Sequence, residues 1–200
     1  MKNEYNQVYQ FKITLKNISS PIWRRIQVPE SYSFWDLHVA IQDVMAWLDY
    51  HLHEFEIGNP STGVKVEIGI PDEGFDGDRG VLPGWKQKIV DYFTMENRVA
   101  YYEYDFGDCW EHTIKLEKIL PRDENIDYPV CTAGKRACLP EDCGGVRGYE
   151  DFLEIINNPD HEEYEETMEW VGGAFDPEYF DVEEVSFDDP DERWKIAFKK

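Results

Sequence analysis

Two segments near the start of the chain show alternating apolar and polar side chains. In residues 8–17 every second side chain is apolar, and the alternation resumes in residues 22–29 after a Ser-Ser-Pro break. The face expected to be buried carries Tyr9, Phe11, Ile13, Leu15, Ile22, Arg24, Ile26 and Val28. The pattern therefore predicts a β-hairpin whose apolar face includes one arginine.

Helical spacing replaces this alternation after residue 33. Ser33 can cap a helix together with Asp36, three residues later. Apolar side chains then recur every three or four residues at Leu37, Ile41, Val44, Met45 and Leu48. Residues 51–58 and 63–71 return to a strand pattern. The order strand, strand, helix, strand is that of a β-grasp-like unit.

The rest of the chain predicts a long hairpin followed by a helical part. Residues 98–120 alternate around a tight turn, and the proline and glycine residues of 121–148 predict an irregular segment. Helical patterns follow at residues 149–157 and 161–171. A short strand or helix near the end is expected to dock Trp194, Ile196 and Phe198. The predicted fold class is α+β.

No internal repeat or long linker divides the chain, so we expect a single α+β domain over residues 1–200. Its parts are a sheet-rich region (5–120), an irregular cysteine loop (121–148) and a helical acidic part (149–200). We expect all three parts to share one core.

The charge of the chain is strongly negative. Forty-two Asp and Glu residues against twenty Lys and Arg residues give a net charge of −22, which repels phosphates, so we expect no direct binding of nucleic acid. Residues 121–200 alone carry −15. This acidity is typical of a surface that docks a basic protein partner, and also of a solvated helix face or of a protein from a salt-rich cytoplasm.

The apolar runs of the chain are only a few residues long, which is too short for a membrane-spanning helix. The first ten residues are polar and lack the apolar region of a signal peptide. We therefore expect a cytoplasmic protein with no membrane contact.

Five segments stand out together along the chain. They are IWRRI (22–26), LHVAIQDVMAWLDYHLHEF (37–55), YEYDFGDCWEHTIKLE (102–117), CTAGKRACLPEDCGGVRGYEDFLE (131–154) and WVGGAFDPEYFDVEEV (170–185). In this order they resemble the plasmid pRiA4b ORF-3-like family, whose genes occur on plasmids, in transposable elements and in chromosomes. The resemblance implies an association with mobile elements and supplies no catalytic residue. Relatives usually carry a non-thiol residue at the position of Cys109, which argues against a family-wide thiol role there.

Histidines and carboxylates gather in two of these segments. Alternation places His51 and His53 on one face, with a spacing that suits a shared metal ion. The segment DFGDCWEH brings together four candidate catalytic residues, namely Asp105, Asp108, Glu111 and His112. Two structural alternatives stay open: histidines that are buried and hydrogen-bonded, and aspartates that shape a hairpin turn.

Three cysteines lie close together in the irregular loop. Cys131, Cys138 and Cys143 could hold a zinc ion with His112 or another group as the fourth ligand, although the chain has no CxxC pair. The alternative is that they are small side chains packed against the core. Together, the candidate metal ligands are Cys131, Cys138, Cys143, His51, His53 and His112.

The arginine on the apolar face of the hairpin needs a partner, because an unpaired buried charge is costly. Asp105 and Asp108 offer carboxylates that a guanidinium can bind with two hydrogen bonds. We therefore expect a structural ion pair between Arg24 and one of these two aspartates.

Two hypotheses about function follow. The first is a non-enzymatic, acidic accessory or protein-interaction domain that binds a basic partner. The alternative is a metal-dependent enzyme of the hydrolase class that uses the histidine and aspartate residues. Bound metal in the purified protein would favour the second hypothesis.

Overall fold

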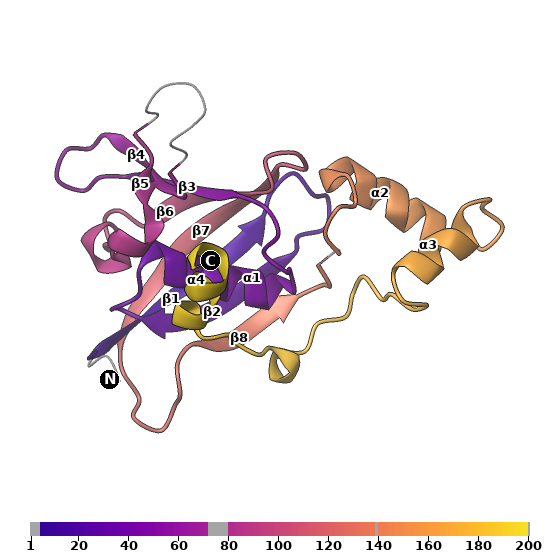
Figure 1. Cartoon of the computed structure of the whole chain (residues 1–200). Helices are drawn as coiled ribbons and strands as arrows, with labels where there is room; N and C mark the ends of the chain where they lie inside the picture. The colour runs from indigo at the N-terminus through magenta and orange to yellow at the C-terminus, as the bar shows by residue number, and fades with distance from the viewer. Residues whose placement is uncertain (1–4, 72–79, 139, 200) are drawn as a thin grey trace.

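The computed structural model describes residues 5–71, 80–138 and 140–199. Eight of the described strands form one sheet in the order β5-β4-β3-β6-β7-β1-β2-β8, and helices cover part of it (Figure 1). The strands are β1 (Gln7–Leu15), β2 (Trp23–Pro29), β3 (His53–Gly58), β4 (Lys65–Gly69), β5 (Leu82–Pro83), β6 (Val99–Tyr104), β7 (Trp110–Pro121) and β8 (Val130–Lys135). The helices are α1 (Phe34–Met45), α2 (Gly145–Ile156), α3 (Tyr164–Trp170) and α4 (Pro190–Phe198), with 3-10 turns at Gly84–Lys86, Ile89–Asp91 and Val182–Glu184.

This architecture confirms the predicted α+β class. The chain order β1, β2, α1, β3 matches the predicted strand-strand-helix-strand unit, and β6 with β7 forms the predicted hairpin. Within the sheet β3 pairs with β6, so the hairpin lies between β3 and β1. The face of β1 and β2 that alternation predicts to be apolar is buried, and Arg24 lies in it with 2% exposure.

Helix α1 begins and ends for identifiable reasons. The Ser33 side chain accepts a hydrogen bond from the Asp36 N–H (3.2 Å), and the Asp36 carboxylate accepts one from the Ser33 N–H (2.7 Å), which forms the predicted capping box. The helix ends at Met45 because Ala46 adopts a left-handed conformation (φ 59°). Leu48, expected on the helix, therefore lies beyond it and is 60% exposed.

The irregular region contains a strand that the sequence pattern hides. Residues 130–135 form β8, which pairs with β2, so the expectation of irregular structure is wrong there. Glycine looks unfavourable in a strand, yet Gly134 is required: a Cβ at this position would lie 2.1 Å from the Phe180 ring. The glycine therefore reflects close packing of an aromatic ring on the strand.

Helices α2 and α3 project away from the sheet as a pair (Figure 1). Phe152 of α2 contacts Trp170 of α3 (ring centroids 6.0 Å apart) and also Phe175, which follows α3 (5.1 Å). Helix α3 has no buried residue. This pair is therefore mostly surface.

The last helix, α4, packs on α1 (Figure 1). Trp194 and Phe198 dock, as expected: their rings lie 5.5 Å apart, and the Phe198 ring lies 5.4 Å from that of Trp35. Ile196 was expected to dock as well but is 81% exposed, because it lies on the opposite face of the helix. Within the part of the chain that the structure describes, no helix has the length and apolar character needed to cross a membrane.

Replacing Asp43 by Asn is expected to stabilise the protein at neutral pH. Burial raises the pKa of Asp43 to about 6, although its carboxylate accepts a hydrogen bond from the Asp188 N–H (3.0 Å). Because the folded state disfavours the charged form, ionisation lowers stability as the pH rises from about 4 through 6. Allowing for solvent screening of this partly exposed group, Asp43→Asn should add about 1–2 kcal/mol at pH 7.5. Urea unfolding should show this gain at pH 7.5 and little gain at pH 4; a loss of stability at pH 7.5 would contradict it.

Candidate functional site

The DFGD turn between β6 and β7 is built by its own aspartates. Asp105 has a positive φ (56°), and its Oδ1 accepts hydrogen bonds from the N–H groups of Gly107 (2.9 Å) and Asp108 (3.3 Å). The Asp108 carboxylate accepts a hydrogen bond from the Gly144 N–H (3.1 Å). The turn alternative is therefore observed, and Asp108 ties the turn to the start of α2.

Next to this turn lies the surface cluster, which we define as His51, Asp105 and Asp142. His51 Nε2 is 2.9 Å from Asp142 Oδ1 and 3.6 Å from Asp105 Oδ2. The Asp142 side chain is 68% exposed and that of His51 is 31% exposed. An imidazole between two carboxylates can exchange a proton with solvent or contribute to a cation site.

Tyr104 and Glu141 lie next to the surface cluster, and the Tyr104 ring contacts that of His51 (centroids 5.8 Å apart). The Tyr104 hydroxyl donates a hydrogen bond to Glu141 and accepts one from the Tyr50 N–H (3.0 Å). The other carboxylate oxygen of Glu141 accepts from the Leu48 N–H (2.8 Å). Burial, together with the bond to Glu141, raises the pKa of Tyr104, so the hydroxyl stays a donor. These bonds fix the segment after α1 against the loop before α2.

A second group, the buried cluster, consists of His38, Asp49 and His53. His38 comes from the middle of α1, Asp49 follows that helix, and His53 begins β3. One ligand atom from each of the three lies within 4.8 Å of the others. The two imidazole rings stack with centroids 3.4 Å apart and an interplanar angle of 10°. Among the described residues, this cluster and the surface cluster are the sets of three or more potential ligands that meet this distance.

Hydrogen bonds hold His38 at both ring nitrogens. Its Nε2 lies 2.9 Å from Asp49 Oδ1, and its Nδ1 lies 2.8 Å from the hydroxyl of Tyr102. Burial alone would raise the pKa of Asp49, but its contacts with His38 and Arg193 outweigh burial and lower it. Burial holds the pKa of His53 well below its usual range, so this imidazole is neutral.

The predicted catalytic group Asp105, Asp108, Glu111 and His112 does not come together. Successive side chains of a strand point to opposite faces, so Glu111 lies on the solvent face of β7 and His112 in the core. Glu111 binds Lys16 (3.1 Å) and Asn17 (2.7 Å). The His112 ring is fully buried beside Trp47 and Tyr102. The prediction of a joint acid/base site is therefore wrong.

His51 and His53 do not share a metal site either. The strand begins at His53, so the alternation assumed from residue 51 does not extend to His51. His51 belongs to the surface cluster and His53 to the buried cluster. Each histidine meets carboxylates, but not the partners that its spacing suggested.

The predicted ion pair of Arg24 is also wrong, although its burial is confirmed. Its guanidinium donates to the carbonyls of Val44 (2.7 Å), Trp23 (3.0 Å) and Lys135 (3.0 Å). It also lies over the Phe180 ring, 3.9 Å from the centroid. The sheet explains the absence of Asp105 and Asp108: β1 separates β2 from β7, and the DFGD turn lies before the first residue of β7.

The three loop cysteines are not arranged as a zinc site. No set of described side chains whose ligand atoms lie within 4.8 Å of one another contains a cysteine. Cys131, Cys138 and Cys143 are partly buried and pack against the core, as the alternative predicts. Burial raises the pKa of Cys143 to about 12, which disfavours the thiolate that zinc requires. His112, the expected fourth ligand, is buried on β7 instead.

Two members of the buried cluster, His38 and Asp49, were not recognised in the sequence, and neither was Asp142 of the surface cluster. His38 and Gln42 are four residues apart in α1 and interrupt its apolar face. Two polar side chains on the buried face of a helix are a signal that could have identified His38. Asp49 and Asp142 lie in loops with positive φ values (62° and 64°), for which the apolar pattern gives no signal.

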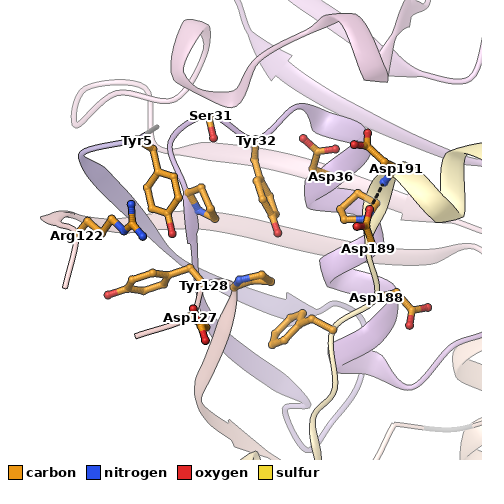
Figure 2. Close-up of a pocket in the computed structure, with 14 residues that line it drawn as sticks. Tyr5, Ser31, Tyr32, Asp36, Arg122, Asp127, Tyr128, Asp188, Asp189 and Asp191 are labelled. Atoms are coloured by element: carbon orange, nitrogen blue, oxygen red, sulfur yellow. Dashed lines mark hydrogen bonds between the residues drawn. The ribbon is translucent and has the colours of Figure 1, made fainter. Parts of the chain in front are cut away.

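A separate pocket of about 410 Å³ lies between the end of β2, the loop before β8 and the segment that leads into α4 (Figure 2). Arg122 lies at one end with Tyr5 and Tyr128, and the aspartates 36, 188, 189 and 191 lie at the other (Figure 2). None of the residues singled out in the sequence as catalytic or metal-binding lines it. Its excess of carboxylates suits a cationic group.

Comparison with known proteins places this chain in one family. The plasmid pRiA4b ORF-3-like protein family model matches residues 7–184. The uncharacterized protein y4hQ of Sinorhizobium fredii (strain NBRC 101917 / NGR234) is 34% identical over 168 residues, which cover 84% of this chain and 82% of that protein. The crystal structure of MM3350, a protein of unknown function from Methanosarcina mazei Go1, is similar with a TM-score of 0.85 and 56% identity, over 92% of this chain and 100% of that one. The chain belongs to the plasmid pRiA4b ORF-3-like family.

Proposed function

We propose that the protein is an accessory protein-interaction domain that binds a basic partner through its acidic arm, which we define as residues 145–185. The arm comprises α2, α3 and the chain that returns toward α4. It projects from the sheet, so a partner can reach it from several sides (Figure 1).

The charge of the acidic arm is the observation that carries this proposal. The arm has fourteen acidic residues and one basic residue, Arg147, so it holds −13 of the total charge of −22. All fourteen acidic residues are exposed. Such a concentrated field attracts a positively charged surface and accelerates its association.

Aromatic side chains add an apolar component to this surface. Trp170 is 49% exposed and Tyr179 is 50% exposed, although both lie among carboxylates. Tryptophan and tyrosine are the residues that most often anchor protein interfaces. The carboxylate-rich pocket next to α4 offers a further place for a lysine or arginine side chain. These features support a specific protein partner.

The alternative hydrolase hypothesis is weakened, because the histidines and aspartates on which it depends do not come together in one site. The surface cluster keeps His51 and Asp105 together, with side chains that are 31% and 12% exposed. It supplies one imidazole and two carboxylates, whereas the acidic arm supplies an extended surface. The arm therefore carries the proposal.

Neutralising three acidic residues of the arm is expected to weaken binding of a labelled arginine-rich peptide by about tenfold or more at low salt. The variant is Glu162→Gln, Glu165→Gln and Glu169→Gln, and the measurement is fluorescence anisotropy at several salt concentrations. The matched control changes three exposed acids elsewhere, Asp91→Asn, Glu96→Gln and Glu124→Gln, with the same loss of charge. Trp170→Ala should also weaken binding about tenfold without changing its salt dependence.

An equal effect of the arm variant and the control variant would contradict the proposal, because it would show that only total charge matters. Full binding by Trp170→Ala would remove the anchoring role of that residue. Circular dichroism spectra of all variants establish that the helices remain folded.

A further inference from the structure

We infer that the buried cluster of His38, Asp49 and His53 is a binding site for one transition-metal ion of the zinc or iron(II) class. This site is independent of the acidic arm and of any partner. Two imidazoles and one carboxylate form a donor set that suits these ions better than calcium or magnesium, which prefer oxygen ligands alone.

The side chains around the cluster contain polar atoms that lack partners. His53 Nδ1 and Gln42 Oε1 are buried and have no hydrogen bond. Buried polar atoms are nearly always satisfied, so one such atom in the cluster and one beside it point to a missing ligand or a changed hydrogen-bond arrangement.

The hydrogen bonds of His38 can rearrange to free a second nitrogen for the ion. A carboxylate only accepts, so without metal we assign the His38 hydrogen to Nε2, which donates to Asp49, while Nδ1 accepts from the Tyr102 hydroxyl. In the other tautomer the hydrogen is on Nδ1 and is donated to Tyr102, while Nε2 faces Asp49 with its lone pair. The Tyr102 hydroxyl then needs a new acceptor, and a half-turn of the neighbouring Gln42 amide supplies one (Gln42 Nε2 to Tyr102 Oη, 3.0 Å). The His38 proton moves from Nε2 to Nδ1 and Tyr102 keeps its own proton, so no proton is gained or lost.

Other residues orient and enclose the site. Arg193 of α4 lies 3.3 Å from Asp49 Oδ2, so Oδ1 is the oxygen that faces the histidines. The Trp35 ring lies 5.2 Å from the His38 ring and 6.0 Å from the His53 ring, and its Nε1 donates to the Pro190 carbonyl (2.9 Å). Such contacts to the ligating side chains hold metal ligands in place. The Asp49 side chain is 13% exposed, which leaves a route to solvent.

The experiment uses the full chain, freed of metal with a chelator and titrated with Zn²⁺ or Co²⁺. We expect one ion per chain, and Asp49→Asn should weaken binding by at least about 100-fold, since even outer-shell changes cost 10–100-fold. The matched controls, His51→Gln of the surface cluster and Cys143→Ser of the loop, should bind the ion as the wild type does. Affinity is measured by calorimetry, and circular dichroism establishes that each variant is folded.

A measurement on the unchanged protein keeps the inference testable if Asp49→Asn fails to fold. Imidazole nitrogen NMR spectra of the wild type should show that Zn²⁺ shifts two of the five histidines, and these two should persist in the His51→Gln variant. The absence of zinc binding at micromolar concentrations would overturn the inference. So would loss of binding in Cys143→Ser, or a thiolate-to-cobalt charge-transfer band, because either result places the ion at the cysteines.

Discussion

Arg24→Ala is expected to lower the free energy of unfolding by about 3–5 kcal/mol. Arg24 is 2% exposed, and its guanidinium donates hydrogen bonds to three backbone carbonyls. One of them, the Val44 carbonyl, belongs to the last turn of α1, which has no basic residue of its own. Arg24 thus supplies, from β2, the positive charge that the negative end of the helix favours. Alanine removes this charge, leaves the three carbonyls without the guanidinium hydrogen bonds and creates a cavity next to Phe180.

The neighbouring arginine provides the control for this prediction. Arg25 lies on the solvent face of β2 and forms a partly exposed pair with Glu117 (2.6 Å). Arg25→Ala should therefore cost less than about 1 kcal/mol. Urea unfolding of the two variants at pH 7 measures both effects. Equal losses would show that the buried carbonyl contacts of Arg24 do not contribute as argued.

Acidification from pH 7 to 4 is expected to remove about 3 kcal/mol of stability through His112 alone. Burial lowers the pKa of this fully buried imidazole to about 4, whereas the unfolded chain has a histidine pKa near 6.5. Below pH 6.5 the histidine of the unfolded chain takes up a proton, whereas His112 of the folded protein stays neutral until the pH approaches 4. The contribution of His112 is therefore intact above pH 6.5 and is lost as the pH falls toward 4.

His112→Phe keeps an aromatic ring beside Trp47 and Tyr102 but cannot be protonated. The variant should show a pH dependence of unfolding that is flatter between pH 6.5 and 4 by the same amount. The measurement is the free energy of unfolding in urea at half-unit pH steps. Identical slopes for the variant and the wild type would show that another group is responsible.

The sequence predicted the helices and strands better than it predicted which residues contact one another. The apolar face of β1 and the Ser33 capping box are local patterns, because they depend on residues two to four positions apart. The pattern missed β8, since Gly134 and nearby prolines resemble a loop until the Phe180 ring is placed on the strand. The partner of Gly134 lies 46 residues away, beyond the reach of a local pattern.

The candidate sites show the same limit. Burial of Arg24, His53 and His112 followed from alternation and is confirmed. Their partners depend on strand order, which no local pattern contains. For Arg24, carbonyls at the end of α1 and on β8 replaced the expected aspartates, and for His53 a histidine from α1 replaced His51.

The central pairing of β1 with β7 has a consequence for how the protein folds. Ile13 lies opposite Ile114, about a hundred residues along the chain, whereas β1–β2 and β6–β7 are local hairpins. We expect the two hairpins to form early and the pairing of β1 with β7 to form late. Closing so long a loop costs conformational entropy before any contact between the two strands offsets it. Until then each half of the sheet exposes an unpaired apolar strand. Slow folding at high concentration would therefore favour aggregation through β1 and β7.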